Sequence, residues 1–459
     1  MVTPDGDIFP NAYAPAVENS ENMWALMEEL FPHYRALCGP GFHDSLKRIS
    51  RHVALDISEF PSGTDVMGWL IPKEFQPNEV WVEDSNGDRV IDSANESYHV
   101  LLYGQPFDGV IDRDELIRHI EIHSHLDDAV PLRQTYYRER WGLCASKKQV
   151  EALAPGNYHV HIDVAQFDGS LRIGDAFLPG ESKQEILLNT YLCHPKGAND
   201  NLSSVVVAVE LFRMLSALPR RHFSYRLALW PESIGAIAYI ANYPDRLKRT
   251  VGGYSFMMCG DAAPIRFTGT FEANSVFDRA ARHALRWNEM PDEPLPYSRW
   301  TGGSDAMHFD SAGLRIPFCT FTRGGPNLDL YPAYHSSADD LSLVKPEYLF
   351  ETLKVAWDAI MTVERAVTYQ ANYTVDPFLS KYGIFPYQHG AGDGKHGNLI
   401  ARAYFELMGS LDGKLDLLSI AEKYDMPIEA FDEPVEKFLE KKLISKVDEV
   451  SPFNASEMP

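Results

Sequence analysis

Histidine and carboxylate side chains occur at spacings that suit a catalytic metal ion. His194 and Asp200 both lie in CHPKGANDN, and His335 lies in the later stretch YPAYHSSADD. Imidazole and carboxylate groups are the usual ligands of a catalytic zinc ion, which takes three protein groups and leaves one position open for water. His194, Asp200 and His335 are therefore candidate zinc ligands.

Two further acidic residues complete a set that can hydrolyse an amide. Glu232 lies in WPES and Asp261 in CGD, each directly after an apolar segment. Asp261 is a fourth candidate ligand. Glu232, if it does not bind the metal, can act as the general base that takes a proton from the attacking water and passes it to the leaving amine.

Each of these residues also has an ordinary structural interpretation. A histidine after a strand can simply hydrogen-bond within a loop, and Asp200 could be the N-cap of the next helix. Glu232 could be a carboxylate favoured at a helix start, and Asp261 a turn former. Cys193 neighbours His194, but adjacent strand residues point to opposite faces, so we expect the thiol to point away from the metal.

Arg323 and Asp305 are predicted to lie on the substrate side of the site. Arg323 precedes His335 on one strand-to-loop connection, and its guanidinium can clamp a substrate carboxylate through two bonds. The alternative is an arginine that satisfies loop carbonyls. Asp305 follows a glycine pair in GGSDAMHF, where a turn and an N-cap account for Ser304 and Asp305, so we expect Asp305 to support the site without binding metal.

Apolar strands that alternate with helices must position these residues. Buried strands of this kind form a mainly parallel sheet with helices on both faces, and ligands gather beyond the carboxyl ends of its strands. The sequence therefore predicts an α/β fold. The expected strands are 185–192, 225–230, 255–259 and 316–322, and the expected helices are 203–215, 234–243 and 347–366.

Two further parts accompany this α/β pattern. Residues 67–175 are rich in alternating apolar residues and in Asn-Gly and Asp-Gly turns, as in 98–109 and 157–174, which predicts a β-rich inserted domain. Near the C-terminus, three short helices with a turn at Met426-Pro427 have the outline of a winged-helix module. The predicted domains are 1–66 with 176–370, 67–175, and 371–459.

The composition excludes several classes of protein. The chain has 459 residues, 45% of them hydrophobic, which predicts two or three folded domains. A formal net charge of −23 argues against a nucleic-acid partner, because such partners need clustered Lys and Arg. The five cysteines form no CxxC pair and indicate reduced thiols in a cytoplasmic protein. No segment is expected to target the protein or to span a membrane. The expected partner is a small-molecule or peptide substrate, and a homo-oligomer stays open.

Several motifs resemble those of the M28 class of co-catalytic zinc aminopeptidases. They are HPxxANDNxS, PESIG, a GD after the third strand, GGSD and YPAYHSSADD. The sequence is more closely similar to a bacterial aminopeptidase-like group with a β-rich insert, here containing YYRERWGLC at 136–144, and a C-terminal winged helix. The resemblance covers nearly the whole chain and implies a zinc exopeptidase-like fold. It makes His194 and Asp261 ligands of one metal, Asp200 the bridging carboxylate, His335 a ligand of the other metal, and Glu232 the general base.

One position departs from the two-zinc pattern of that class. The two-zinc enzymes have a second, metal-binding glutamate after the base, whereas Ser233 follows Glu232 here. A serine hydroxyl is a poor zinc ligand, so we expect one zinc ion, with a second left open. Two ligand sets are possible for that ion. One is His194, Asp200 and Asp261, and the preferred one is His194, Asp200 and His335.

Three functions are compatible with the sequence. The first is zinc-dependent hydrolysis of an amide in an N-terminal amino acid or a small N-acyl metabolite. The second is zinc-dependent acyl transfer or cyclisation on the same fold. The third is a winged-helix regulator whose α/β domain senses a ligand, although residues 411–450 hold eleven acidic and six basic side chains, which disfavours DNA binding.

Overall fold

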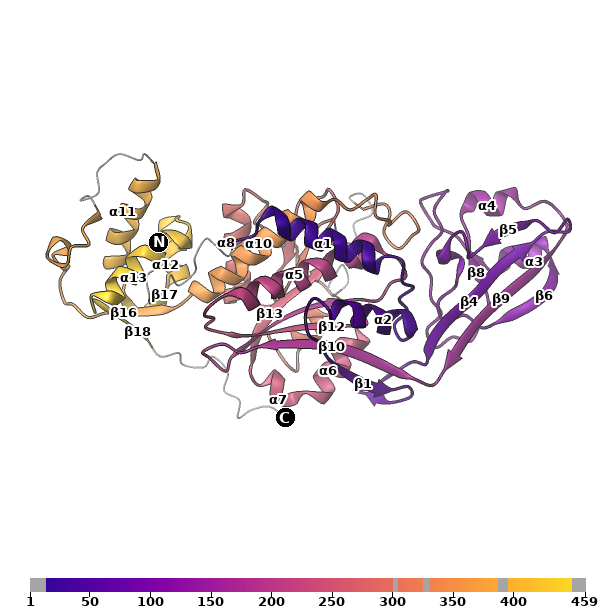
Figure 1. Cartoon of the computed structure of the whole chain (residues 1–459), viewed down its shortest axis with the longest axis horizontal. Helices are drawn as coiled ribbons and strands as arrows, with labels where there is room; N and C mark the ends of the chain where they lie inside the picture. The colour runs from indigo at the N-terminus through magenta and orange to yellow at the C-terminus, as the bar shows by residue number, and fades with distance from the viewer. Residues whose placement is uncertain (1–13, 300–303, 325–330, 387–394, 448–459) are drawn as a thin grey trace.

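The protein is built in three parts along its long axis. The computed structural model describes residues 14–299, 304–324, 331–386 and 395–447. A central α/β part lies between a β-rich part at one end and a smaller helical part at the other (Figure 1). None of the described helices is long and apolar enough to cross a membrane.

A seven-stranded sheet forms the middle of the central part. Its four inner strands run parallel, and the strands at its two sides are antiparallel to their neighbours. The mainly parallel sheet predicted from the sequence is therefore confirmed. In sheet order the strands are β1 (Asp56–Pro61), β10 (Ser170–Leu178), β12 (Ser224–Trp230), β11 (Glu185–Tyr191), β13 (Thr250–Met257), β15 (Phe318–Thr322) and β14 (Arg266–Thr268).

Helices cover both faces of this sheet, which explains why its strands are continuously apolar. Every residue of β11 is buried. Successive side chains of a strand point to opposite faces, so Ile186 and Leu188 pack in one core with α1, α5 and α10, while Leu187 packs in another core with α6. The helices are α1 (Val17–Leu30), α2 (Pro40–Ile49), α5 (Ser204–Ala217), α6 (Ile234–Asn242), α7 (Pro244–Leu247), α8 (Val276–Trp287), α9 (Ala306–Phe309) and α10 (Pro346–Arg365).

The β-rich part has a separate hydrophobic core under an antiparallel sheet. In sheet order its strands are β5 (Arg89–Asp92), β4 (Glu74–Glu83), β9 (Asn157–Phe167) and β6 (Phe107–Asp112). Short strand pairs and two helices surround it: β2 (Asp65–Val66) with β3 (Trp69–Leu70), β7 (Ile120–Glu121) with β8 (Leu143–Cys144), α3 (Arg113–Arg118) and α4 (Lys147–Ala152).

Two details of this part differ from the sequence-based expectation. Strand β10 begins at Ser170 and already belongs to the central sheet, although the expected insert extended to residue 175. Only Asp168 and Gly169 separate β9 from β10, so the alternating pattern continues while the chain changes sheets. The stretch 98–109 was expected to be a strand, but only its end from Phe107 is one. Its apolar residues from Val100 to Tyr103 are consecutively buried, and they cross the core as irregular chain.

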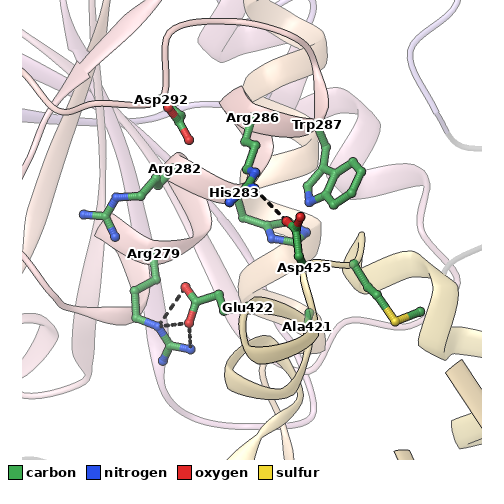
Figure 2. Close-up of a pocket in the computed structure, with 10 residues that line it drawn as sticks. Arg279, Arg282, His283, Arg286, Trp287, Asp292, Ala421, Glu422 and Asp425 are labelled. Carbon is green, nitrogen blue, oxygen red and sulfur yellow. Dashed lines mark hydrogen bonds and ion pairs between the residues drawn. The ribbon is translucent and has the colours of Figure 1, made fainter. Parts of the chain in front are cut away.

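The C-terminal part packs against α8 and α10 of the central part. Its strands are β16 (Thr368–Ala371), β17 (Asp412–Asp416) and β18 (Ile444–Lys446), and its helices are α11 (Lys395–Met408), α12 (Leu417–Tyr424) and α13 (Asp432–Glu440). Its buried side chains continue the core of the central part. Arg279 of α8 donates to Glu422 at 2.7 Å, and Arg286 pairs with Asp425 at 2.7 Å, beside a small pocket between α8 and α12 (Figure 2).

Candidate metal centre and active site

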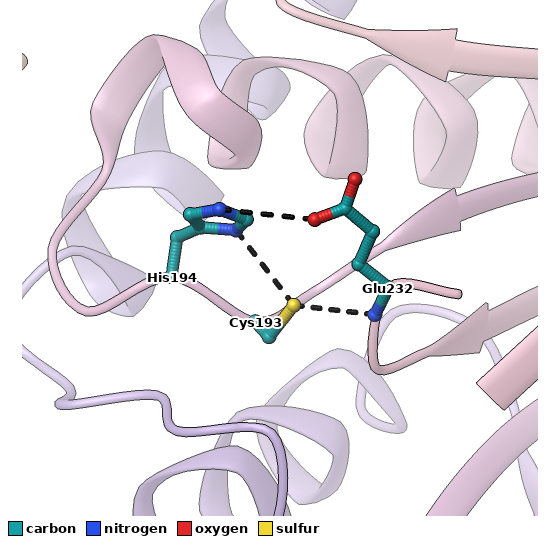
Figure 3. Close-up of side chains that lie close together, drawn as sticks. All are labelled: Cys193, His194 and Glu232. Carbon is teal, nitrogen blue, oxygen red and sulfur yellow. Dashed lines mark hydrogen bonds and ion pairs between the residues drawn. The ribbon is translucent and has the colours of Figure 1, made fainter. Parts of the chain in front are cut away.

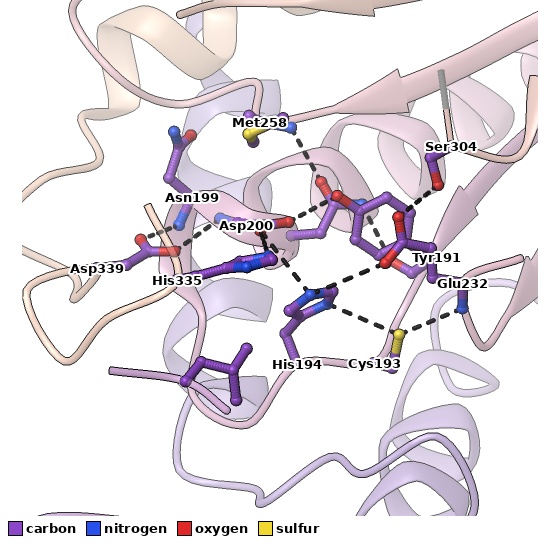
Figure 4. Close-up of polar contacts among 12 residues, drawn as sticks. Tyr191, Cys193, His194, Asn199, Asp200, Glu232, Met258, Ser304, His335 and Asp339 are labelled. Carbon is purple, nitrogen blue, oxygen red and sulfur yellow. Dashed lines mark hydrogen bonds and ion pairs between the residues drawn. The ribbon is translucent and has the colours of Figure 1, made fainter. Parts of the chain in front are cut away.

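The candidate zinc ligands meet beyond the carboxyl end of β11. His194 lies three residues after that strand, and Asp200 lies in the irregular turn Ala198–Ser203 that leads into α5. His335 comes from the long connection between β15 and α10 (Figure 4). The parallel strands explain this meeting, because their carboxyl ends lie at one edge of the sheet.

The geometry of these three side chains suits a metal ion. The Nε2 atom of His335 lies 3.1 Å from Oδ2 of Asp200, and Nε2 of His194 lies 3.9 Å from the same oxygen. One ligand atom from each residue lies within 4.8 Å of the others. Oδ1 of Asp200 accepts a hydrogen bond from the Tyr191 hydroxyl at 2.6 Å, whereas Oδ2 is buried without a hydrogen-bond donor. This unsatisfied oxygen, facing two imidazoles, fits a zinc ion.

Charge in this cluster points to the same conclusion. Burial raises the pKa of Asp200, but the adjacent His194 and His335 outweigh burial and bring it to about 2. Burial lowers the pKa of His194, but the Asp200 carboxylate and Cys193 outweigh it, so that pKa lies well above its usual range. A buried carboxylate that is held ionised needs a positive charge beside it, which either a protonated imidazole or a metal ion can provide.

Glu232 lies on the other side of His194 from Asp200. Its Oε2 atom is 3.9 Å from Nε2 of His194, and the Ser304 hydroxyl donates to its Oε1 atom at 2.7 Å (Figure 4). The Glu232 side chain is 31% exposed. It is thus fixed at one oxygen, adjacent to the candidate metal site and open to solvent, as a general base must be.

Cys193 lies in this group, contrary to the expectation that its thiol points away. Its Sγ atom lies 3.7 Å from Nδ1 of His194 and accepts a hydrogen bond from the Glu232 backbone N–H at 3.2 Å (Figure 3). Strand alternation does not apply here, because β11 ends at Tyr191 and His194 has a φ of 83°. Because the thiol contacts Nδ1, it orients the imidazole and leaves Nε2 for a metal.

Asp339 holds the turn that carries Asp200. Its two carboxylate oxygens accept the backbone N–H groups of Asn199 at 2.6 Å and of Asp200 at 2.9 Å. Burial raises the pKa of Asp339 to about 7. The sequence-based reasoning did not single out this residue, although its YPAYHSSADD motif contains it.

The β-rich part holds the loop that carries His335. The Leu132 N–H donates to the His335 carbonyl at 2.7 Å, and the Ser337 N–H donates to the Val130 carbonyl at 2.8 Å. The Tyr334 ring stacks on the His335 ring at 3.8 Å. A predicted ligand is therefore positioned by a segment far from it in sequence.

Asp261 is not among the residues that the structure groups as metal ligands. Its carboxylate accepts the Asn199 amide at 2.7 Å and the Ala263 N–H at 2.7 Å. In the part of the chain that the structure describes, the clusters able to hold a metal contain Cys193, His194 and Glu232, or His194, Asp200 and His335. Asp261 thus supports Asn199, next to Asp200, and its role as a metal ligand stays a prediction.

Arg323 and Asp305 also have structural partners in place of the predicted substrate contacts. The Arg323 guanidinium is buried and donates to the Ala263 carbonyl at 2.7 Å and to Glu351 at 2.6 Å, so the alternative of a loop-binding arginine holds. Asp305 is buried and accepts the Trp230 indole N–H at 2.7 Å. It also accepts the Ser233 N–H at 2.8 Å, and so fixes the turn that presents Glu232.

Residues 24–366 match a family model described as a domain of unknown function, DUF4910. The chain belongs to the DUF4910 family. Among relatives of this DUF4910 protein, a Clostridium acetobutylicum protein, named for polysaccharide biosynthesis and for an aminopeptidase-like domain, is 32% identical. That match spans 89% of this chain and 92% of the relative.

Several solved structures share the fold of the DUF4910 chain. A Clostridium acetobutylicum structure named for a peptidase has a TM-score of 0.84 at 30% identity, covering 94% of this chain and 97% of the other. A zinc aminopeptidase from Bacillus subtilis has a TM-score of 0.54 at 14% identity (74% and 94% covered). An M28 peptidase precursor from Shewanella amazonensis has a TM-score of 0.55 at 11% identity, covering 80% of this chain and 96% of the other. The resemblance to the M28-type superfamily is thereby confirmed for the fold.

Proposed function

We propose that this DUF4910 protein is a zinc-dependent amidohydrolase of the aminopeptidase type. The observation that carries the proposal is the buried Oδ2 atom of Asp200, which has no hydrogen-bond donor and faces the Nε2 atoms of His194 and His335. Those three residues would hold one zinc ion. The substrate is an amide of an N-terminal amino acid or of a small N-acyl metabolite.

The residues around this site supply the proton transfers of amide hydrolysis. When bound, zinc polarises the amide carbonyl and makes the attacking water more acidic. Oε2 of Glu232 is open to the site and takes the proton of that water, while the Ser304 hydroxyl holds Oε1. Glu232 then passes the proton to the nitrogen of the leaving amine, which completes cleavage of the C–N bond.

Metal analysis together with a substrate screen tests this proposal. Purified protein should contain zinc, lose activity on chelation and regain it when zinc is returned. The screen should include aminoacyl amides and N-acyl amino acids, with product analysis to separate hydrolysis from acyl transfer or cyclisation. A protein that binds no zinc, or that is fully active without metal, would overturn the proposal.

A second candidate substrate class is an N-acyl amino sugar. The name of the Clostridium relative, which refers to polysaccharide biosynthesis, favours it. The same residues would cleave such an amide, because the chemistry acts on the acyl C–N bond and not on the sugar. Release of acetate from N-acetylglucosamine by the zinc-loaded protein would support this class over aminoacyl substrates.

We also propose a domain organisation for the chain. The α/β domain carries the site, and the β-rich insert packs on it. We assign residues 371–459, of which the structure describes 371–386 and 395–447, to a winged-helix-like module. The ion pairs of Arg279 and Arg286 with that module support a packing role, and its net acidic charge disfavours nucleic acid. All five cysteines are buried free thiols, which supports a reducing compartment such as the cytoplasm.

A further inference from the structure

Exposed aromatic and aliphatic side chains from two short segments of the β-rich part lie together. Met67, Trp69 and Leu70 come from the β2–β3 hairpin, and Tyr136 and Tyr137 come from the YYRERWGLC motif. These five residues, the aromatic rim, are between 45% and 66% exposed. The Tyr137 hydroxyl donates to the Leu70 carbonyl, which joins the two segments. Grouped exposed apolar side chains of this kind mark binding surfaces.

The aromatic rim adjoins the candidate active site through Trp69. The Trp69 ring meets the His308 ring edge-on at 6.3 Å, and His308 belongs to the same short segment as Ser304, which donates to Glu232. Burial raises the pKa of Tyr136, and Glu232 raises it further, which agrees with a position on the same side of the molecule as the proposed base. Trp69 thus connects the rim to the segment that holds Glu232.

The backbone of the aromatic rim is held in uncommon conformations. Met67 and Gly68 form the two-residue turn of the β2–β3 hairpin with φ values of 54° and 84°, and Asp65 accepts the Gly68 N–H at 2.9 Å. Tyr136 also has a positive φ, 51°. Such conformations in residues other than glycine persist where the surroundings fix them, and they cluster at functional sites. The rim is therefore presented in a defined shape.

We propose that the aromatic rim binds a large apolar side chain of the substrate, branched aliphatic or aromatic, next to the amide that Glu232 helps to cleave. This inference rests on the proposed function. The rim carries no charged side chain, and Met67 and Leu70 have no hydrogen-bonding group for a sugar or a charged residue. Three ring faces and two aliphatic side chains instead match an apolar group, whose burial is favourable in proportion to its area.

Paired substrates and a matched variant test the specificity. Wild-type zinc-loaded protein should hydrolyse leucine p-nitroanilide with a kcat/KM at least about tenfold above that for glycine p-nitroanilide. Trp69→Ala should remove most of this difference by raising KM for the leucine substrate, with little change for glycine. Trp287→Ala is the control, because Trp287 is similarly exposed but lies on α8 beside the C-terminal part. Equal loss on both substrates, or no preference in the wild type, would overturn the inference.

A binding measurement separates this inference from the proposed function. Protein labelled with 5-fluorotryptophan, its Trp69 signal assigned with Trp69→Phe, is titrated by fluorine NMR with leucinamide and with glycinamide. A Trp69 signal that shifts with leucinamide but not with glycinamide supports substrate binding at the aromatic rim. If no amide is cleaved, only the proposed hydrolysis is then overturned. Hydrolysis of aminoacyl amides without any change in the Trp69 signal would support the proposed function but overturn the proposal that the aromatic rim binds the substrate.

Discussion

The two oxygens of Asp200 have different surroundings, and this difference explains the chemistry of the site. Oδ1 is held by the Tyr191 hydroxyl, and the backbone N–H of Asp200 is held by Asp339, so the carboxylate cannot turn to satisfy Oδ2 within the protein. The unsatisfied oxygen is therefore directed at the two imidazoles. Residues that do not bind the metal but hydrogen-bond to its ligands hold those ligands in position when the metal is absent.

Glu232 should be needed for turnover and not for metal retention. Glu232→Gln keeps the side-chain size and the bond from Ser304 but cannot accept the proton, so we expect activity to fall about 10²-fold or more with zinc content nearly unchanged. His194→Ala should lose both zinc and activity. Zinc by elemental analysis and kcat on a verified substrate check this. Glu181→Gln, at an exposed ion pair with Arg220, serves as control. Wild-type activity in Glu232→Gln would disprove the assignment of the base.

The number of zinc ions should be one per chain. Asp261 is engaged with Asn199 and Ala263, and Ser233 offers a hydroxyl where a second carboxylate would be needed, so a second ion lacks ligands. Chelated protein titrated with zinc should regain full activity at about one equivalent. Ser233→Glu should add weaker second binding, which calorimetry would detect. Full activity that needs two tightly bound ions would contradict this expectation.

The sequence reveals the site residues whose position is set by the neighbouring strand. It does not reveal contacts with residues that are distant in the chain. His194 and Glu232 come two to three residues after buried strands, and Asp200 lies in the turn between β11 and α5, so the strand pattern places all three at one edge of the sheet. Asp261 and Arg323 also follow strands, but their side chains bond to loop groups distant in sequence. No spacing rule contains that information, so the ligand role of Asp261 and the clamp role of Arg323 stay predictions.

At the scale of elements, the contact between α8 and the C-terminal part contains a buried histidine. The Ile428 N–H donates to Nε2 of His283 at 3.1 Å, so this ring must be neutral at Nε2. Burial lowers the pKa of His283 to about 4, and Arg286, Arg365 and Arg279 lower it while Glu422 opposes them. The sequence alone could not show that His283 faces a segment about 145 positions later in the chain.

This histidine should make stability fall in mild acid. Because its folded pKa lies below the unfolded value of 6.5, its contribution is fully present above pH 6.5 and is lost as the pH falls toward 4. The loss is at most about 3 kcal/mol in the free energy of unfolding. Urea unfolding at pH 7 and pH 5 measures it. In His283→Gln, whose carbonyl can accept the same N–H without titrating, the fall should be smaller. An identical pH dependence in both proteins would exclude His283 as its source.

At the scale of the whole molecule, the β-rich part contacts the segments that carry the candidate site. Its sheet has its own core, and the alternating pattern of residues 67–175 predicts a separate domain. Yet the segment from Val130 to Leu132 hydrogen-bonds to the loop of His335, and the Trp69 ring of the aromatic rim meets the His308 ring. These contacts join residues about 200 positions apart. They depend on how the two parts pack, which the sequence pattern of either part does not encode.

Zinc should therefore stabilise part of the β-rich insert as well as its own ligands. A bound ion that requires His335 in place also requires the bonds from Leu132 N–H to the His335 carbonyl and from Ser337 N–H to the Val130 carbonyl. With zinc at about a thousand times its Kd, openings that release His335 become costlier by about 4 kcal/mol. Hydrogen exchange of the Leu132 and Ser337 amides should then slow by up to about a thousandfold, if those openings carry their exchange. The amides between β4 and β9 should change little, because that sheet is held by its own core and contacts no ligand. Equal slowing in both places would show that zinc stabilises the molecule only globally, and no slowing at Leu132 would show that the insert does not hold the metal loop.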